Sequence, residues 1–298
     1  NQTEYYLTFD SPTECDILIV GGGGGGGRRA GGGGGAGALI YHKNQLLNGT
    51  YNIKVGKGGR GCFFSEAQAS SNGRNLGDSS GFTGEDSQFI KSDNTKEYLA
   101  KGGAGGHGGN YALNNVGGSG GGRCYSVGNP TSLLTTLNKF NDSIVNITSG
   151  STYDNTTLIY PEGCYGNLSG DQTTNYHGGG GGGAGGIGQD NGNDSDNSKN
   201  GYGGDGLSID ITGSNIIYAG GGSGSDHTGT ISQVFNSTKS TIQNRGGGGY
   251  GSDNGIPQNG LDGTGGGGGG QGTDTQTAGS GGSGVILVRY KRNMGTPT

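Results

Sequence analysis

Short runs of β-branched and aliphatic residues lie directly beside blocks of glycine along this chain. Asp16–Val20 runs into seven glycines at 21–27, and Asn215–Ala219 runs into Gly220–Gly222. The order is reversed near the C-terminus, where Val285–Val288 follows a glycine-rich segment. Runs of this length and composition predict β-strands. The pattern therefore predicts strands that each lead into, or out of, a glycine segment.

Other segments are identified by the spacing of their apolar residues. Tyr51–Val55 and Leu207–Ile211 alternate with a period of two, which predicts two more strands. The Asn48–Gly49 step just before the first of them predicts a hairpin turn. Only Pro130–Phe140 has helical spacing, with leucines on one face and a proline suited to the first turn. Most of the chain is therefore predicted to be strand or extended structure.

Glycine supplies 78 of the 298 residues, whereas hydrophobic residues supply 27% and tryptophan is absent. Such a composition is typical of disorder, and it cannot fill a conventional side-chain core in a domain of this length. Collagen is excluded because the glycines follow no Gly-X-Y period and only five prolines occur. The glycines are instead gathered in blocks with strand-like borders, which favours an ordered role for them.

An ordered glycine block cannot rely on side-chain packing. Glycine is a poor helix former, and a strand of pure glycine has nothing to pack. The remaining regular structure is an extended left-handed helix with three residues per turn and no internal hydrogen bonds, so its backbone groups must bond to neighbouring helices. We therefore predict a lattice of polyglycine II helices, or rods, that include Gly24, Gly33, Gly180, Gly247 and Gly267.

The cysteines and the first residue bear on the compartment. Cys15, Cys62, Cys124 and Cys164 are dispersed and show no metal-binding spacing. An even number predicts two disulfides with three connectivities open, and buried thiols in a cytosolic protein are the alternative. The chain begins with Asn1 rather than methionine, which suggests that a signal peptide has been removed or that the sequence starts at the boundary of an expressed fragment. No apolar stretch is long enough to span a membrane. We predict a secreted or surface-displayed protein.

N-glycosylation would fit that location. Asn-X-Ser/Thr sequons occur at Asn1, Asn48, Asn141, Asn146, Asn155, Asn167, Asn193 and Asn236. A chain this rich in asparagine, serine and threonine produces several sequons by chance. Glycosylation is therefore a hypothesis that depends mainly on the predicted secretion.

One stretch of the sequence is similar to a known family. Ile17–Tyr41, in which Arg28-Arg29-Ala30 joins two glycine blocks, resembles the glycine-rich domains of the polyglycine II sandwich type, as do Tyr51–Gly59 and the terminal strand at Gly284–Tyr290. Such domains occur in phage tail-fibre tip adhesins, in surface proteins of microbes and large viruses, and in the extracellular part of anaplastic lymphoma kinase receptors. The resemblance implies the architecture for about residues 15–290. Function in such families resides in variable loops.

Basic residues are concentrated between residues 17 and 65, where no acidic residue occurs. They are Arg28, Arg29, Lys43, Lys54, Lys57 and Arg60. We interpret them either as a docking surface for an anionic partner, such as an acidic polysaccharide or a neighbouring subunit, or as solvated loop charges. The oxygen-rich segment 190–196 lacks the spacing of a calcium loop and is interpreted as a solvated loop.

Catalytic motifs are missing from the sequence. The glycine block at 21–27 matches a dinucleotide-binding pattern only trivially, because no acidic residue follows at the required distance. The four histidines have no nucleophile or acid partner suggested by their flanking residues. The net charge of −5 disfavours a dedicated nucleic-acid binder. We therefore predict a protein that is not an enzyme and that binds no cofactor and no nucleic acid.

The predicted fold is mostly β and irregular: short strands flank a hydrogen-bonded lattice of polyglycine II helices, with at most one short α-helix. Residues 1–14 are predicted as an N-terminal extension or edge strand, 15–290 as a single glycine-rich domain and 291–298 as a C-terminal tail. We expect a structural glycoprotein that self-associates into a filament, fibre or surface coat. Strand edges at Glu4–Phe9 and Val285–Tyr290 would join the subunits.

The alternative hypothesis is an adhesin or receptor-binding tip. Its variable loops 66–96, 125–176 and 223–245 would recognise glycans or a host surface protein. The fifteen tyrosines suit sugar binding or subunit contacts, because each ring offers stacking area and a hydroxyl, and capping of the lattice edges is the competing interpretation. A receptor ligand-binding domain is a third hypothesis.

Overall fold

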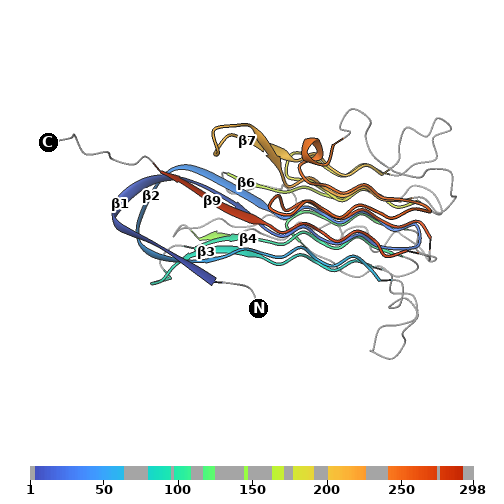
Figure 1. Ribbon diagram of the computed structural model, residues 1–298, viewed down its shortest axis with the longest axis horizontal. Helices are drawn as coiled ribbons and strands as arrows, with labels where there is room; N and C mark the ends of the chain where they lie inside the picture. The colour runs from blue at the N-terminus through green and yellow to red at the C-terminus, as the bar shows by residue number, and fades with distance from the viewer. Residues whose placement is uncertain are drawn as a thin grey trace, which may run out of the picture.

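A computed structural model describes residues 4–63, 80–94, 97–108, 117–124, 144–146, 163–170, 177–190, 201–225, 241–273 and 276–290. The protein is elongated, with β-strands at one end and extended segments that run side by side from them toward the other end (Figure 1). We call the strand end the base. The opposite end, where residues 28–30 make a turn, is called the tip.

The regular elements of the described residues are nine strands and one short 3₁₀-helix. They are β1 (Glu4–Val20), β2 (Leu39–Lys54), β3 (Ser87–Lys91), β4 (Glu97–Ala100), β5 (Ile144–Asn146), β6 (Cys164–Tyr165), β7 (Leu207–Ile209), β8 (Ile216–Tyr218), η3 (Gln243–Arg245) and β9 (Val285–Tyr290). No α-helix occurs in this part of the chain, and the helix predicted at Pro130–Phe140 lies outside it. The predicted class, mostly strand and irregular structure, is confirmed.

Seven of these strands form one antiparallel sheet in the order β5-β4-β3-β2-β1-β9, with β6 paired to β2 beside that path. β7 and β8 form a separate antiparallel pair. β1 and β2 pair along their whole lengths, from Glu4 opposite Lys54 to Val20 opposite Leu39. β1 is continuous across residues 14 and 15, where the domain was expected to begin. The β1–β2 ribbon curls back at the base (Figure 1), so its two halves lie in different layers.

The curl of the ribbon coincides with an irregularity in its register. Phe9 lies opposite Gly49, and the next pair joins Thr13 to Leu47, so β1 carries extra residues here. Gly49 has a φ of 76°, which glycine adopts without the steric cost of a Cβ. The hairpin predicted at Asn48–Gly49 is therefore wrong. The chain bends there without reversing, because β1 and β2 pair on both sides of the bend.

The apolar run Asp16–Val20 forms the last part of β1 and is buried on both faces. Ile17 and Ile19 pack in one apolar cluster with aromatic side chains of the folded-back ribbon and of β3 and β4. Leu18 and Val20 pack in a second cluster with residues of β7 and β8. Successive side chains of a strand alternate between its faces, so this strand is the central layer of the base.

A cluster of polar side chains holds β9 and the segment after β7 against β1 and β2. Arg289 donates from Nε and Nη2 to Oδ2 of Asp16 at 3.1 and 2.6 Å, and from Nη1 to the carbonyl oxygen of Asp210 at 3.2 Å. Tyr41 donates its hydroxyl to Oδ1 of Asp210 at 3.2 Å. Burial by itself would raise the pKa of Asp16, but the N–H of Asn44 and the Arg289 guanidinium lower that pKa below its ordinary value. The charged carboxylate of Asp16 on β1 therefore links β2, through the N–H of Asn44, with β9, through Arg289.

The glycine block 21–27 is surrounded by other extended segments. Its N–H groups bond with a repeat of three, so that every third residue donates to the same neighbour; for example, Gly24 donates to the carbonyl of Gly35 at 2.8 Å. The three acceptor segments, all antiparallel to the block, are 32–38, 82–85 and 279–282. This three-residue repeat is that of a polyproline II-type helix.

The carbonyl groups of the same block follow the same repeat. Gly268 donates its N–H to the carbonyl of Gly24 at 2.9 Å. The three donor segments, all parallel to the block, are 59–62, 103–106 and 268–271. The block thus has six hydrogen-bonded neighbours, and the block 31–37 is enclosed in the same way. The predicted lattice of rods is present, and amide groups make up its interior.

Neighbouring backbones in this lattice lie too close together for a side chain. A Cβ on Gly24 would overlap the carbonyl oxygen of Ala104. A Cβ on Gly33, Gly180 or Gly267 would overlap backbone atoms of the adjacent segment in the same way. All four of these glycines are buried. The rods therefore need glycine for close approach.

Gly247 differs from the other predicted rod glycines. It has a φ of 85°, and Gly246 before it has a φ of 69°, whereas a polyglycine II helix needs a negative φ near −75°. Gly246 caps η3 by donating its N–H to the carbonyl of Gln243. The lattice resumes at Gly249, which donates to the carbonyl of Gly267 at 2.9 Å. The prediction for Gly247 is wrong because the helix end requires left-handed glycines there.

Substituting alanine at two glycines tests the lattice. We expect Gly24→Ala to prevent folding or to lower the free energy of unfolding by more than about 4 kcal/mol, because the new Cβ overlaps a carbonyl oxygen. Gly186→Ala is the matched control, since a Cβ there would meet its nearest atom at 3.5 Å, an ordinary contact. Its effect should stay within about 1 kcal/mol. Thermal unfolding followed by circular dichroism measures both. A Gly24→Ala protein with the same melting temperature as the unmodified chain would contradict the close packing.

Candidate functional site

Among the described residues, two strand edges at the base have a sheet partner on one side only. Glu4–Phe9 of β1 pairs with β2, while β9 pairs only with Cys15–Val20 and ends the sheet. Tyr5, Tyr6 and Tyr290 on these strands are 57%, 68% and 56% exposed. An edge strand presents unpaired N–H and C=O groups to other chains. Both segments predicted as edges are therefore edges of the described sheet.

The predicted basic residues do not form one surface. Lys43 and Lys54 lie in β2 at the base, where Nζ of Lys43 is 4.0 Å from Oδ1 of Asp210. Arg28 and Arg29 lie in the turn at the tip, and Arg28 is fully buried. The seven-residue block between base and tip spans about 22 Å at the rise of a polyproline II helix. The single docking surface fails as a prediction because the rods separate these charges.

The remaining two basic residues, Lys57 and Arg60, are exposed on one rod, and Arg60 forms an aromatic cluster with two phenylalanines. Its guanidinium carbon lies 4.5 Å from the ring centroid of Phe63 and 4.4 Å from that of Phe82. These are favourable cation–π distances. Arg28 donates from Nη1 to the carbonyl oxygen of Phe63 at 3.0 Å. The cluster therefore fixes the last described residue before segment 64–79.

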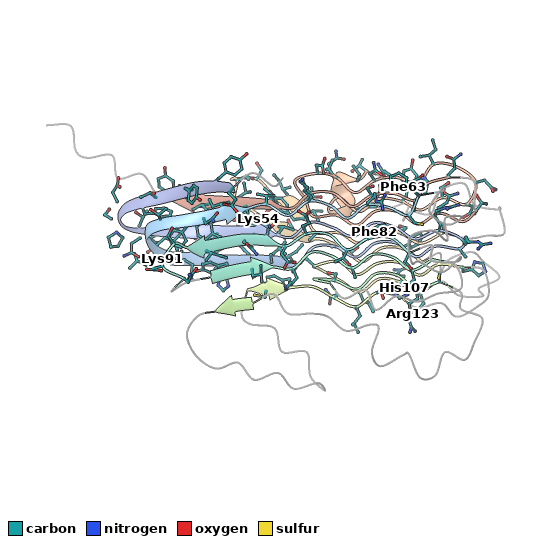
Figure 2. All side chains as sticks on the ribbon, turned by 90° about the horizontal axis from the view of Figure 1, so that it is seen from below. Lys54, Phe63, Phe82, Lys91, His107 and Arg123 are labelled. Carbon is teal, nitrogen blue, oxygen red and sulfur yellow. The ribbon has the colours of Figure 1, made fainter. Side chains whose placement is uncertain are left out.

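Figure 2 places this cluster within a row of side chains near the tip. Phe63, Phe82, His107 and Arg123 follow one another across neighbouring rods, while Lys54 lies at the base. Reasoning from the sequence missed the pairing of Arg60 with Phe63. The signal was their spacing of three, which places both side chains on the same side of a three-residue helix.

The predicted disulfides are absent. All four cysteines lie in the described residues, and no disulfide joins any two of Cys15, Cys62, Cys124 and Cys164. Cys15 and Cys164 share the first apolar cluster, yet Cys164 pairs with Ile40, which pairs with Ile19, four residues along β1 from Cys15. Four strand residues span about 13 Å, beyond the reach of a disulfide. Burial raises the pKa of the Cys164 thiol to about 12, so it stays protonated.

Two sequon asparagines have described side chains. Asn48 is exposed on β2. Asn167 is half-buried and donates from Nδ2 to the carbonyl oxygens of Gly183 and Ala184 at 2.8 and 3.2 Å. Of the other sequons, Asn146 contributes backbone to β5. The rest lie outside the described residues: Asn1, Asn141, Asn155, Asn193 and Asn236.

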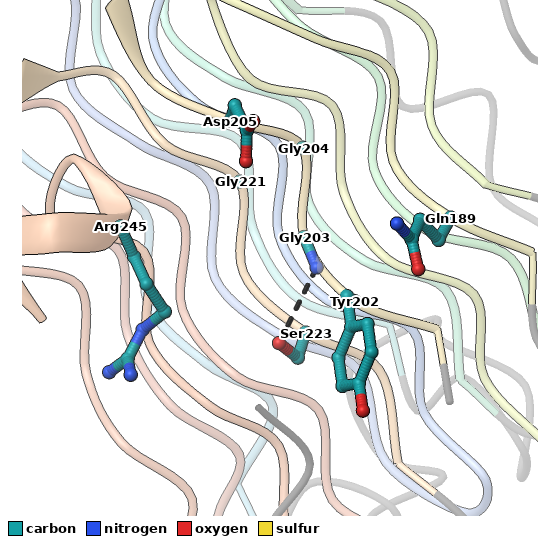
Figure 3. Close-up of a pocket in the computed structure, with 8 residues that line it drawn as sticks. All are labelled: Gln189, Tyr202, Gly203, Gly204, Asp205, Gly221, Ser223 and Arg245. Atoms are coloured by element: carbon teal, nitrogen blue, oxygen red, sulfur yellow. Dashed lines mark hydrogen bonds between the residues drawn. The ribbon is translucent and has the colours of Figure 1, made fainter. Parts of the chain in front are cut away.

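A small pocket opens on one side of the lattice (Figure 3). It is lined by Gln189, Tyr202, Gly203, Gly204, Asp205, Gly221, Ser223 and Arg245 and has a volume of about 30 Å³. The N–H of Gly203 donates to Oγ of Ser223 at 3.4 Å. Nη2 of Arg245 donates to Oε1 of Gln258 at 2.7 Å, which fixes the guanidinium. The volume holds about two water molecules, so we assign no ligand to this pocket.

Long segments of the chain begin at the tip. Cys62, just before Phe63, donates its N–H to the carbonyl of Gly26 at 3.1 Å, and Ser225 donates to that of Gly31 at 3.0 Å. Gly26 and Gly31 flank the turn at the tip. The segments that follow, 64–79 and 226–240, lie outside the described residues and cover 66–79 of the predicted recognition loop 66–96 and 226–240 of the predicted loop 223–245. Residues 82–85 and 87–91 of the first loop instead form a rod and β3, so the prediction of a loop is wrong there. Of the oxygen-rich segment 190–196, only the exposed Asp190 is described.

A family model described as a glycine-rich domain matches residues 2–291. A search of curated proteins finds no significant match. Within the described ranges, no helix has both the length and the apolar character to cross a membrane.

The aromatic cluster at the tip can be tested with one pair of variants. We expect Arg60→Ala to lower the free energy of unfolding by about 1 kcal/mol, because both cation–π contacts are lost. Lys57→Ala is the control: Lys57 is also exposed and lies on the same rod, three residues earlier. Its change should be close to zero. Chemical denaturation followed by circular dichroism measures both, and equal losses would show that Arg60 contributes nothing through the rings.

Proposed function

The chain belongs to the glycine-rich domain family, and we propose that it is a rigid, non-enzymatic building block of an extracellular filament, fibre or surface coat. The observation that carries this proposal is the pair of open strand edges at the base, Glu4–Phe9 and β9. Edges of this kind are templates for pairing with another chain. The partner in this proposal is a second copy of the same chain.

The geometry of the two edges favours an open polymer over a closed dimer. They belong to different strands of one curled sheet, and their side chains differ, with Tyr5 and Tyr6 on one and Arg289 and Tyr290 on the other. Pairing of β1 of one copy with β9 of the next is a heterologous contact, which propagates as a chain unless its rotation closes a ring. Rigid rods behind each contact would transmit its geometry along the polymer.

Two further features are part of this proposal: the protein is extracellular, and its fold is of the polyglycine II sandwich type that the family resemblance implies. The absent disulfides remove one of its arguments, so the support comes from the exposed sequon at Asn48 and from the family resemblance in the glycine blocks. A lattice held by buried amide hydrogen bonds also suits a surface component, because burial protects the backbone from proteases.

A charge placed on one edge tests the assembly. We expect Tyr6→Lys to raise the concentration needed for polymer formation at least about tenfold, because a lysine on an edge strand opposes pairing. The matched control is Ile256→Lys, which also replaces an exposed apolar side chain, 74% exposed, far from the edge. Negative-stain microscopy and sedimentation velocity measure assembly. Equal assembly of both variants would count against the edge.

A second function is favoured by the position of the long segments. Cys62 and Ser225, which bond to the glycines on either side of the turn at the tip, lie just before segments 64–79 and 226–240, and recognition of glycans or a host surface protein by the tip of a rigid lattice would suit an adhesin. The monomeric Tyr6→Lys protein separates the two functions. Specific binding on a glycan array by this monomer, together with no polymer of the unmodified chain, would support the adhesin over the building block.

A further inference from the structure

The two described sequons differ in what the side-chain amide does. Both hydrogens of Nδ2 of Asn167 are used, one toward Gly183 and one toward Ala184. An N-linked glycan replaces one of these hydrogens. A glycosylated Asn167 would therefore keep at most one bond. It would also have to place a sugar against the turn that ends a rod.

The rest of that sequon is enclosed as well. Ser169, the hydroxyl residue of the sequon, is only 8% exposed. The carbonyl of Asn167 itself accepts the N–H of Gly120 at 3.0 Å, so the backbone belongs to the lattice. In the folded protein, Asn167 is a structural residue whose amide caps two carbonyl groups of the neighbouring segment.

Asn48 has the opposite surroundings. It is exposed, and its side-chain amide has no hydrogen-bond partner among the described residues. It lies where the β1–β2 ribbon curls, beside Gly49 with its positive φ. Thr50, the hydroxyl residue of this sequon, makes a 3.0 Å hydrogen bond through Oγ1 to Oγ1 of Thr8, and both are surface residues. A glycan on Asn48 would project from the base without breaking a contact of the fold.

We propose that Asn48 is an N-glycosylation site of this protein and that the Asn167 sequon is left unmodified in the folded chain. The inference rests on the proposed extracellular location, which brings the chain to a secretory oligosaccharyltransferase. In the transfer, Nδ2 of Asn48 forms a bond to the anomeric carbon of a lipid-pyrophosphate-linked oligosaccharide. The bond from that carbon to the pyrophosphate oxygen breaks, the lipid pyrophosphate leaves, and the amide nitrogen releases a proton.

Site-resolved occupancy tests the proposal. The full chain is expressed behind a host signal peptide in insect cells, treated with peptide N-glycosidase in ¹⁸O-water, and digested for mass spectrometry, which marks each formerly glycosylated asparagine. We expect the label at Asn48 in most of the secreted protein and at Asn167 in almost none. Asn48→Gln should remove one glycan from the intact mass, and Asn167→Gln should remove none.

Thermal unfolding of the two variants adds an independent measurement. Asn167→Gln should lower the melting temperature by at least about 3 °C, because the longer side chain misplaces both amide bonds. Asn48→Gln should have the same melting temperature as the unmodified chain when the latter is made in bacteria and therefore carries no glycan. An unlabelled Asn48, or a labelled Asn167 in protein with the full melting temperature, overturns the proposal. If a variant is not secreted, the same labelling is read from chains retained in the endoplasmic reticulum.

The host signal peptide forces the chain into the secretory pathway, so a missing glycan at Asn48 refutes the site whatever the natural location is. The natural location is tested on intact cells or particles of the source. An antibody that does not cross membranes labels the protein only if the protein is exposed on their surface. Glycosylation at Asn48 in the insect cells, with no labelling of the intact source, would refute the location alone.

Discussion

The whole structure depends on direct backbone contact between rods at glycines, where no Cβ keeps the chains apart. At Gly24 the N–H is donated to Gly35, the carbonyl accepts from Gly268, and the position of the missing Cβ faces the carbonyl of Ala104. One residue thus contacts three different neighbours, and the next two residues contact the other three. Any side chain on such a residue would push apart two segments whose hydrogen bonds hold the others in place. The glycine content of the chain follows from this constraint.

The lattice also needs the strands at its base. Ordering glycine costs more conformational entropy than ordering any other residue, and the rods contribute little apolar burial to offset it. β1 and β9 continue directly into rods, and their side chains pack in two apolar clusters. Ser87 connects the side-chain core with the lattice of rods. Its hydroxyl donates to the carbonyl of Val20 at 2.7 Å and accepts the N–H of Gly56 at 2.9 Å. The side-chain core therefore sets the register in which the rods meet.

The repeating parts of this fold could be predicted because a block of glycine beside an apolar run has few alternatives. The strand at Asp16–Val20 and the rods through Gly24, Gly33 and Gly180 follow from that local pattern. Gly247 could not be placed, since its four-glycine block reads like a rod while the short helix before it imposes a positive φ.

Features that depend on register were equally hidden in the sequence. An Asn-Gly step that usually reverses the chain is here a bend, because β1 pairs on both sides of it. The distance between Cys15 and Cys164 depends on which strands pair and in which register. The role of Asn167 depends on the turn that lies beside it. The sequence pattern determines the elements, whereas their alignment decides what each polar side chain does.

A core of amides also limits where function can lie. Inside the lattice, the N–H groups of the central rods are bonded to neighbouring segments, and a Cβ on their glycines would overlap a neighbouring backbone, so chemistry and recognition are confined to its outer faces and its two ends. The base offers backbone edges with exposed tyrosines, and the tip offers Arg60 and Phe63 beside the start of a long segment. Edges bind by main-chain pairing and suit identical subunits, whereas loops bind through varied side chains and suit other molecules. Because a rigid lattice lies between them, each end can change in sequence without disturbing the other, which is the property that a displayed or polymerised module requires.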